Sequence, residues 1–325
     1  LGAGNVSSIG PMDTLYKMFV EGQVVLLKMN PVNEYLGPLV DEMFEPLRAR
    51  GYFRVVYGGA TEGEYLCMHR LVEEIHVTGS DKTHDAIVYG VGEDGARRKA
   101  ADDARNEKRL TCELGNVSPV IVVPGPWSQK DLDFHGMNIA STIVNNAGFN
   151  CTATRVIVQH DSWKRRDALL DSLRNAFRKV ADRKPYYPGA EERQQTFLRH
   201  HPNADQIGAK GPGHVPWTLM HHLDPNDRDE ICFNTESWCA QTSEVGLGAS
   251  SVAEYIDRAV EFCNERVWGT LACSIIVHPK SLKDPAVAEA VERAVANLRY
   301  GAIGVNHWSG LVYGLVTPTW GAFPG

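Results

Sequence analysis

The sequence has no apolar run long enough to cross a lipid bilayer. A transmembrane helix needs about 20 consecutive, mainly apolar residues, and the 325-residue chain contains no such stretch. The first residues also lack a basic flank followed by an apolar core, the pattern of a secretory signal. We therefore expect neither a membrane span nor secretion.

An excess of positive charge is missing as well. The chain carries 33 Lys and Arg against 40 Asp and Glu, which gives a formal net charge of −7. Proteins that bind nucleic acid neutralise phosphates largely with Lys and Arg. We therefore expect a small-molecule ligand and no nucleic-acid partner.

The sequence has no closely spaced pair of cysteines. The seven cysteines are an odd number, widely spread, and none belongs to a C-x-x-C pair. This usage is typical of reduced thiols and indicates a cytoplasmic protein without a disulfide framework or a zinc ribbon. The histidine pairs His200-His201 and His221-His222 stand beside no cysteine or carboxylate at familiar ligand spacing, so we expect no metal site.

Apolar strand-like runs alternate with amphipathic segments along the chain. The strand candidates are "QVVLLKM" from Gln23, "EEIHVTGS" from Glu73, "SPVIVVPG" from Ser118 and "ACSIIVHP" from Ala272. With 43% hydrophobic residues, the chain can build a large core and two domains. The alternation predicts an α/β fold with a largely parallel sheet flanked by helices.

Helical periodicity is clearest in three segments. One repeats Phe134, Met137, Ile139, Ile143 and Val144, a second Leu169, Leu170, Leu173, Phe177 and Val180, and a third follows the S-x-x-E pattern of Ser251 and Glu254. Each segment predicts a helix that buries one stripe of apolar side chains. The third also predicts a capping box at the start of its helix. The charged segment 92–109 and the Pro/Gly/His-rich segment 186–225 interrupt the rhythm and are expected to be surface excursions.

Cys151 lies in the stretch "NNAGFNCTATR" that begins at Asn145. A thiolate is strongly nucleophilic, and a turn beside a helix end can increase the thiolate fraction. A cysteine can equally be an ordinary small buried residue. The residues around it decide between the two, because Asn146, Gly148, Cys151 and Arg155 form an N-x-G-x-x-C run with a following arginine.

This run resembles the nucleophile segment of the aldehyde dehydrogenase superfamily. Further blocks resemble that family in the same order along the chain: Asn5, "VVLLK", "HVTGS", "CELGNVSP", "NTESW", "YGAIGVNHW" and "PTWGAFPG". Departures such as Asn116-Val117, where the family has Gly-Lys, mark a divergent member. Compared with the family pattern, we expect this chain to be truncated at both ends.

The resemblance implies that three residues carry catalysis. Cys151 would attack an aldehyde carbon, Asn5 would donate to the resulting oxyanion, and Glu113 would activate water to hydrolyse the thioester. The product would be a carboxylic acid. A solvated strand-end charge is the competing interpretation of Glu113.

The resemblance also implies NAD or NADP as the cofactor. Lys28, Gly79, Ser80, Glu236 and Trp238 match the positions that bind it. A helix beginning at Ser80 would aim backbone N–H groups at a pyrophosphate, although Ser80 can also be a simple N-cap. Trp238 offers a flat face to the nicotinamide, or is plain core. The choice between NAD and NADP stays open, because Pro31 replaces a glutamate that many relatives carry.

The fold that the resemblance implies has two three-layer α/β/α domains with largely parallel sheets and an active-site cleft between them. Residues 1–113 would form the NAD(P)-binding domain, and residues 114–325 the catalytic domain, whose last residues return to the cleft. The full-length protein would be a homo-oligomer.

Three alternatives remain open on the sequence alone. The chain could be a non-catalytic or weakly active member that binds cofactor or a partner, or an enzyme that transfers the acyl group to coenzyme A. It could also be a cysteine hydrolase without a nicotinamide cofactor, which would need a histidine base near Cys151. No histidine in the sequence stands out as such a base.

Overall fold

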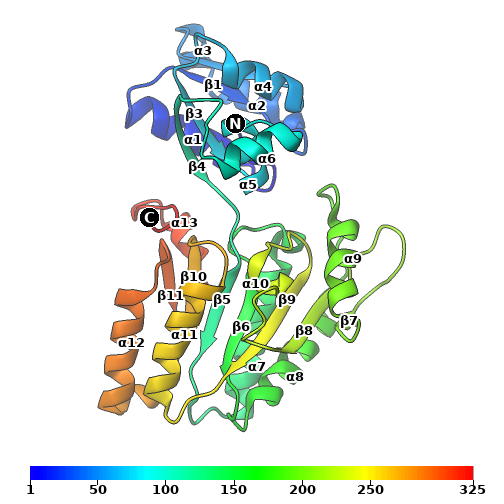
Figure 1. Ribbon diagram of the computed structural model, residues 1–325, viewed down its shortest axis with the longest axis vertical. Coiled ribbons are helices and arrows are strands. Elements are labelled where there is room, and N and C mark those ends of the chain that lie inside the picture. The colour runs from blue at the N-terminus through cyan, green and yellow to red at the C-terminus, as the bar shows by residue number, and fades with distance from the viewer. Residues whose placement is uncertain (325) are drawn as a thin grey trace. The chain divides into compact units, whose positions relative to one another are not determined.

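The computed structural model describes residues 1–324. The chain divides into two compact units, Leu1–Gly115 and Asn116–Gly325 (Figure 1). Each unit alternates strands and helices, which confirms the α/β class predicted from the sequence. In the part that the structure describes, no helix is long and apolar enough to cross a membrane.

The first unit is built from short parallel strand pairs. β1 pairs with β2 and β3 pairs with β4, both in parallel. Its elements are α1 (Ile9–Phe19), β1 (Val25–Lys28), η1 (Glu34–Leu36), α2 (Gly37–Met43), α3 (Glu45–Ala49), β2 (Phe53–Val56), α4 (Ala60–Met68), β3 (Glu74–Thr78), α5 (Asp81–Val88), α6 (Gly92–Ala100) and β4 (Arg109–Glu113). The strands predicted near Gln23 and Glu73 are confirmed as β1 and β3.

The second unit is a three-layer α/β/α sandwich. Its elements are β5 (Ser118–Val122), α7 (Gln129–Val144), η2 (Asn145–Gly148), β6 (Thr154–His160), α8 (Arg166–Lys179), α9 (Ala190–His200), β7 (Asp205–Ile207), β8 (Trp217–Leu223), α10 (Ile231–Asn234), β9 (Gln241–Leu247), α11 (Val252–Arg266), β10 (Ala272–Ile276), η3 (Ser281–Lys283), α12 (Pro285–Asn297), β11 (Ala302–Val305) and α13 (Leu311–Leu315).

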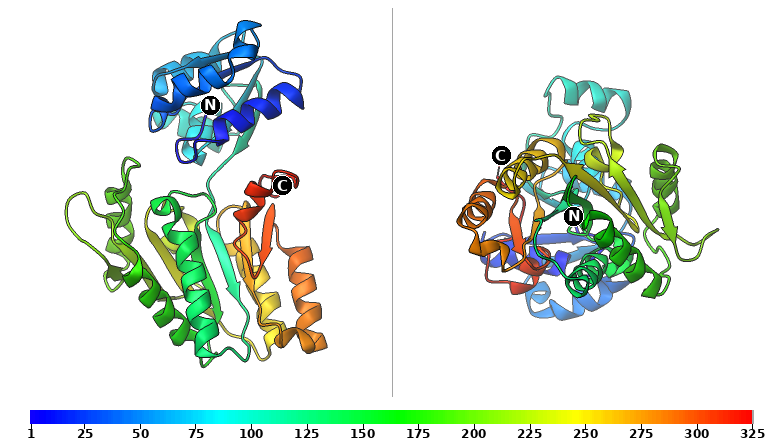
Figure 2. Two further views of the ribbon diagram at one scale, coloured as in Figure 1. Left: turned by 180° about the vertical axis from the view of Figure 1, so that it is seen from behind. Right: turned by 90° about the horizontal axis from the view of Figure 1, so that it is seen from below.

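The sheet of the second unit runs in the order β11-β10-β5-β6-β9-β8-β7. Among residues 1–324, the pairing of β7 with β8 is its one antiparallel contact. Strand β5 is buried on both faces: Ile121 packs toward α11 and α12, while Val120 and Val122 pack toward α7 and α8. Figures 1 and 2 show these helix pairs on opposite faces of the sheet. A strand covered on both faces needs apolar residues at successive positions, and "PVIVV" supplies them.

The predicted helices exist, with corrections in detail. Ile139 and Ile143 of the predicted α7 stripe are buried, whereas Phe134 and Met137 are exposed. Leu132 and small residues complete the buried stripe. The N-cap of α11 is Ser251, as predicted, and its hydroxyl accepts a hydrogen bond from the N–H of Glu254. The Glu254 carboxylate, however, accepts from the N–H of Ser250, so the predicted reciprocal bond is displaced by one residue.

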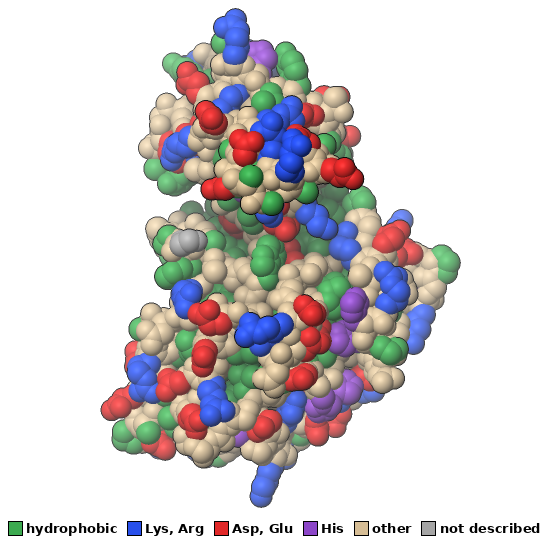
Figure 3. Space-filling model, in the orientation of Figure 1, with side chains coloured by type: hydrophobic (Ala, Val, Ile, Leu, Met, Phe, Trp, Pro, Cys, Tyr) green, Lys and Arg blue, Asp and Glu red, His purple; other side chains and the backbone are tan. Residues whose placement is uncertain are grey.

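The two segments expected to be surface excursions contain regular structure. Within the charged segment, α6 lies at the surface, and its Arg98 pairs with Asp94 and Asp103. Figure 3 shows basic and acidic side chains side by side over this helix. For segment 186–225 the prediction is wrong, because it contains α9, β7 and β8, with Trp217 and Leu219 buried in the core.

A network of charged and polar side chains joins α1 to β3 and β4 in the first unit. Glu74, at the start of β3, accepts hydrogen bonds from Lys17, Gln23 and Arg109. Burial alone would raise the pKa of Glu74, but these hydrogen bonds outweigh it and lower the pKa to about 2. The ionised carboxylate therefore stabilises the fold at neutral pH.

This network predicts a pH-dependent stability difference for Glu74→Gln. Because the folded-state pKa is depressed, the contribution of Glu74 is fully present above its ordinary value of about 4.5 and is lost as the pH falls toward about 2. We expect the variant to have a lower free energy of unfolding than the parent at pH 6 and 7, and the gap to close between pH 4.5 and 2. Urea unfolding across this range measures it. The exposed Glu107→Gln serves as the control, and a gap that does not depend on pH would contradict the prediction.

Candidate active site

The loop that carries Cys151 has an unusual backbone. It connects α7 to β6, and Asn146, Ala147 and Gly148 adopt successive positive φ angles of 51°, 55° and 86°. The left-handed region is costly for residues with a Cβ atom, and alanine rarely enters it. Such conformations persist only where surrounding contacts enforce them, and they cluster at functional sites.

Gly148 is required by a close approach to the start of β9. A Cβ atom at this position would lie 2.7 Å from the carbonyl oxygen of Cys239 and 3.0 Å from the nitrogen of Ala240. Glycine is therefore needed here both for its positive φ and for the lack of a side chain. This contact packs the Cys151 loop directly onto the segment that leads into β9.

Arg155 fastens the same two segments together from within the core. Its guanidinium donates to the carbonyl oxygens of Cys239, Gln241 and Gly148 at 2.6, 3.0 and 2.5 Å. Only 4% of Arg155 is exposed, and this burial lowers the pKa of its guanidinium, an effect that the nearby Glu236 opposes. A buried charge with carbonyl partners on both segments is costly to displace, so it fixes the loop.

The backbone just after the loop is held by side chains from distant parts of the second unit. Ser118 donates to the carbonyl oxygen of Cys151 at 3.1 Å, and the indole N–H of Trp308 donates to that of Thr152 at 2.8 Å. Cys151 itself is half-buried and packs against a small apolar cluster that includes Leu271 and Ala272. Cys151 is therefore a partly buried residue on a backbone that distant side chains hold in place.

Aromatic side chains surround the loop on another side. Phe149 is fully buried, and its ring lies 4.9 Å from Tyr186, 5.5 Å from Tyr187 and 6.3 Å from Trp238. The Tyr186 hydroxyl also donates to the side-chain oxygen of Asn146 at 3.0 Å. These contacts support the backbone conformation of the loop.

The structure brings Cys151, Glu236 and Trp238 into one region of the second unit. Glu236 and Cys151 both act electrostatically on Arg155, and Trp238 packs edge-on against Tyr187. The carbonyl oxygen of Trp238 accepts hydrogen bonds from Arg193. Cys151 and Glu236, predicted from two separate sequence blocks, are therefore both near the same buried arginine, and Trp238 lies near Phe149 of the Cys151 loop.

Four other candidate residues lie at the carboxyl ends of parallel strands in the first unit. Lys28 ends β1, Glu113 ends β4, and Gly79 and Ser80 follow β3. The N–H of Gly79 donates to the carbonyl oxygen of Glu113 at 3.0 Å, so these two lie side by side. In α/β proteins, ligands bind beyond the carboxyl ends of parallel strands. The fifth candidate, Asn5, is half-buried in a bend between Gly2 and α1.

Ser80 and Lys28 both have contacts within the protein. The Ser80 hydroxyl accepts from the N–H of Thr83 at 3.2 Å and caps α5. The amino group of Lys28 donates to the carbonyl oxygens of Gly58 and Met29 at 2.5 and 3.2 Å. Burial lowers the pKa of Lys28, and the charge of Glu62 partly restores it. An ammonium has three N–H donors, and these two bonds use two of them.

Sequence reasoning overlooked several residues that shape the site. Asn116, noted only as a departure from the family, is fully buried and donates to Ser118 at 2.7 Å. Gly269, with φ of 92°, leaves room for it, because a Cβ atom there would lie 2.6 Å from the Asn116 side-chain oxygen. Trp308 ends the block "YGAIGVNHW", but the hydrogen bond that it donates to the backbone of Thr152 could not be predicted, and Tyr186 gave no sequence signal, since each acts on a group that is distant along the chain.

Residues 5–197 match the sequence profile described as the aldehyde dehydrogenase family. The match covers more than half of the chain, and the protein therefore belongs to this family. The resemblance inferred from the sequence motifs is confirmed.

Curated relatives support the assignment over a shorter region. The chain is 30% identical over 141 residues to a 4-trimethylaminobutyraldehyde dehydrogenase from Rattus norvegicus, and 31% identical over 145 residues to that from Sus scrofa. Each match covers 43% of this chain and 26% of the relative. The matched region therefore spans about a quarter of the length of these relatives.

Solved structures share the fold over most of the chain. A salicylaldehyde dehydrogenase from Pseudomonas putida G7 complexed with salicylaldehyde gives a TM-score of 0.72 at 16% identity, covering 94% of this chain and 60% of that one. An NADP-dependent glyceraldehyde-3-phosphate dehydrogenase from Bacillus halodurans C-125 complexed with NADP gives 0.67 at 18% identity, covering 91% and 57%. These similarities confirm the predicted aldehyde dehydrogenase-like α/β fold.

The contacts of Gly148 predict that Gly148→Ala disrupts the Cys151 loop. The added Cβ meets the backbone of Cys239 and Ala240, and the positive φ adds strain. We expect a loss of about 1–3 kcal/mol in the free energy of unfolding and an altered rate of iodoacetamide labelling at Cys151. Gly314→Ala is the matched control, because nothing lies within 4 Å of a Cβ atom there. Equal behaviour of the two variants would contradict the role assigned to Gly148.

Burial predicts a clear order of thiol reactivity. Burial raises the pKa of the Cys239 thiol to about 11, whereas Cys151 is half-buried. In a Cys112→Ser background, which removes an exposed thiol, we expect iodoacetamide at pH 8 to label Cys151 and leave Cys239 unmodified. Peptide mass spectrometry over a time course measures both sites. Labelling of Cys239 ahead of Cys151 would refute the prediction.

Proposed function

We propose that this protein oxidises an aldehyde to a carboxylic acid, with Cys151 as the nucleophile and NAD or NADP as the oxidant. The observation that supports it most is the loop of Cys151, where a partly buried cysteine stands on a strained backbone fixed by Arg155 and Ser118. Membership of the aldehyde dehydrogenase family supports the same chemistry.

In the first step, the thiolate of Cys151 attacks the aldehyde carbon. A carbon–sulfur bond forms, and the carbonyl oxygen becomes an oxyanion. The side-chain amide of Asn5 and the backbone N–H of Cys151 are the proposed donors to this oxygen. A preorganised donor of this kind typically contributes about 3 kcal/mol to the transition state.

The residues that we propose for binding a nicotinamide cofactor are described for each unit by itself. Lys28, Gly79 and Ser80 lie at the strand ends where nucleotides bind in α/β folds, and the remaining N–H of Lys28 suits a ribose hydroxyl. Glu236 and Trp238 are proposed to contact the nicotinamide ribose and ring. When bound, NAD or NADP would supply the hydride acceptor, and the oxidised acyl group would remain on Cys151 as a thioester. Pro31 supplies no carboxylate to repel a 2′-phosphate, so both NAD and NADP are candidates.

Glu113 is the proposed general base for the last step. Its carboxylate would take a proton from water, which then attacks the thioester carbonyl, releases the acid and restores the Cys151 thiol. A carboxylate at this position favours hydrolysis over transfer to coenzyme A, which needs no activated water.

We further propose a homo-oligomeric full-length protein in the cytoplasm. The arrangement of the seven cysteines as free thiols is compatible with a reducing compartment. The aldehyde itself is a small molecule, as the names of the relatives suggest for those proteins.

The proposal is tested by mixing the protein with NAD or NADP and each of a panel of aldehydes, and following the absorbance of the reduced nicotinamide. We expect turnover by the parent, none by Cys151→Ala, and for Glu113→Gln a single-turnover burst followed by a rate lowered about 10²–10⁴-fold, because acylation proceeds while hydrolysis is blocked. Glu107→Gln, an exposed glutamate outside the site, serves as the control and should match the parent.

Two results would overturn parts of this proposal. If no aldehyde yields reduced cofactor with either NAD or NADP, while both cofactors still bind by calorimetry, the protein is a non-catalytic binding member of the family. If turnover requires coenzyme A and its rate is unchanged by Glu113→Gln, the acyl group is transferred to the thiol of coenzyme A.

A further inference from the structure

Three side chains of the second unit form a cluster to which the proposed chemistry assigns no role. His201 follows α9, Glu230 directly precedes α10, and Cys232 lies within α10. A ring nitrogen, a carboxylate oxygen and the sulfur of these residues all lie within 4.8 Å of one another. His201 and Glu230 are 29 positions apart in the sequence, so no familiar ligand spacing joins them.

The carboxylate of Glu230 is the centre of this cluster. The Nε2 atom of His201 lies 2.8 Å from its Oε1 atom, and the N–H of Cys232 donates to the same oxygen at 2.9 Å. Glu230 is only 7% exposed. Burial would raise its pKa, but the hydrogen bonds from His201 and Cys232 outweigh this effect and lower the pKa. Glu230 is therefore a buried anion at neutral pH.

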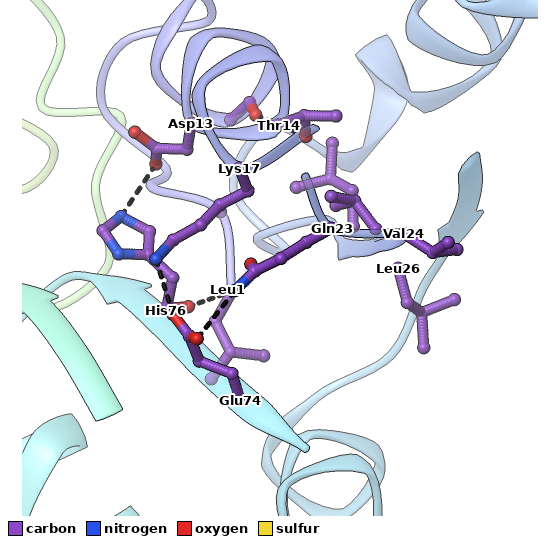
Figure 4. Close-up of a pocket in the computed structure, with 13 residues that line it drawn as sticks. Leu1, Asp13, Thr14, Lys17, Gln23, Val24, Leu26, Glu74 and His76 are labelled. Atoms are coloured by element: carbon purple, nitrogen blue, oxygen red, sulfur yellow. Dashed lines mark hydrogen bonds and ion pairs between the residues drawn. The ribbon is translucent and has the colours of Figure 1, made fainter. Parts of the chain in front are cut away.

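Glu230 lacks the permanently charged partners that Glu74 has in the first unit. Lys17 binds Glu74 (Figure 4), and Arg109 binds it as well. Among residues 1–324, His201 is the one ion-pair partner of Glu230, and a histidine is not permanently charged at neutral pH. Buried charges in proteins are paired or coordinate metals. A bound cation would supply the positive charge that lysine and arginine supply to Glu74.

Cys232 adds a soft ligand at the border of the core. The residue is 3% exposed and belongs to the same apolar cluster as Phe197 and Phe233. Burial raises the pKa of its thiol, and the charge of Glu230 raises it further, so the thiol by itself is neutral. A thiol that coordinates a metal ion loses its proton, which here passes to solvent. The thiolate and the carboxylate then carry two negative charges, which balance one divalent cation.

The backbone around the cluster is held by contacts that do not involve the three side chains. Arg266 donates to the carbonyl oxygens of Pro225 and Asp227 at 2.9 and 2.7 Å, in the loop before α10. The N–H of Trp268 donates to the carbonyl oxygen of Phe233, within α10, at 2.8 Å. Groups that are already in place lose little freedom when a ligand binds.

We propose that His201, Glu230 and Cys232 bind one Zn²⁺ ion, with water as the fourth ligand. Zn²⁺ accepts nitrogen, oxygen and sulfur ligands together, whereas Mg²⁺ and Ca²⁺ require oxygen. Its bonds to these atoms are about 2.0–2.3 Å long. Ligand atoms that lie within 4.8 Å of one another therefore need movements of only about 1 Å to reach a common ion.

The position of the site defines how the ion enters and what it holds. The side chain of His201 is 17% exposed, against 7% for Glu230, so the ion reaches the cluster past the histidine ring. Once bound, it joins the end of α9 to α10, shortly before Glu236 and Trp238. The site does not depend on the chemistry proposed for Cys151.

Titration with Co²⁺, a coloured substitute for Zn²⁺, tests the proposal. The Cys112→Ser/Cys151→Ser background removes the exposed and the half-buried thiol, and every other cysteine is buried. We expect one equivalent of Co²⁺ to give the visible bands of tetrahedral coordination and a thiolate-to-metal charge-transfer band. Zn²⁺ should abolish both, and excess Mg²⁺ should leave both unchanged.

Variants in this background assign the bands to the cluster. Cys232→Ala should lose the charge-transfer band. His201→Gln, which can still donate to Glu230, should bind at least about 100-fold more weakly, because loss of even an outer partner of a metal ligand costs about 10- to 100-fold in affinity. The neighbouring His200 is exposed, so His200→Gln is the matched control and should bind like the background protein.

Thermal unfolding with and without Zn²⁺ gives a second readout. Zn²⁺ should raise the unfolding midpoint of the background protein and of His200→Gln, and leave that of His201→Gln unchanged, because only a ligand that binds the folded site stabilises it. An equal rise in all three proteins would mean adventitious binding and would overturn the proposal. So would the lack of a charge-transfer band in the background protein, or a band that survives Cys232→Ala.

Discussion

The guanidinium of Arg155 is the contact on which the rest of the candidate active site depends. It binds carbonyl oxygens on both sides of a junction, one from the Cys151 loop and two from the start of β9. Without this buried donor, several carbonyl groups in the core would lose their partner, and the strained positive φ angles at Asn146 and Ala147 would lose one of the contacts that hold them. The position of Cys151 is thus a consequence of how two strands of the central sheet are tied together.

The first unit applies a different constraint, the common direction of its strands. Because β1 and β2 are parallel, and β3 and β4 are parallel, with Leu1 and Gly2 bonded in parallel between β1 and β3, their carboxyl ends lie on one edge. Lys28, Gly79 and Glu113 gather there for that reason.

Several features of the fold could be predicted from local patterns. The run "SPVIVV" predicted a strand, and it forms β5, whose burial on both faces accounts for the consecutive apolar residues. The prediction that Phe134 and Met137 are buried was wrong. Their spacing fits the apolar stripe of α7, but their side chains are exposed. Strand β8 was missed because the glycines, prolines and histidines around it obscured a buried stretch between Trp217 and Leu223. Periodicity describes one element at a time, and the neighbours that cover it are set by the whole sheet.

By itself, the sequence determined the family, the α/β class and the identity of the candidate nucleophile, because these are written in short motifs and in the alternation of apolar runs. The tertiary structure decided how Cys151 is held. The three bonds of Arg155, the close approach of Gly148 to Cys239, and the hydrogen bonds from Ser118 and Trp308 join residues that lie far apart along the chain. Such contacts depend on packing between distant segments, and no local pattern of residues encodes the distance between them.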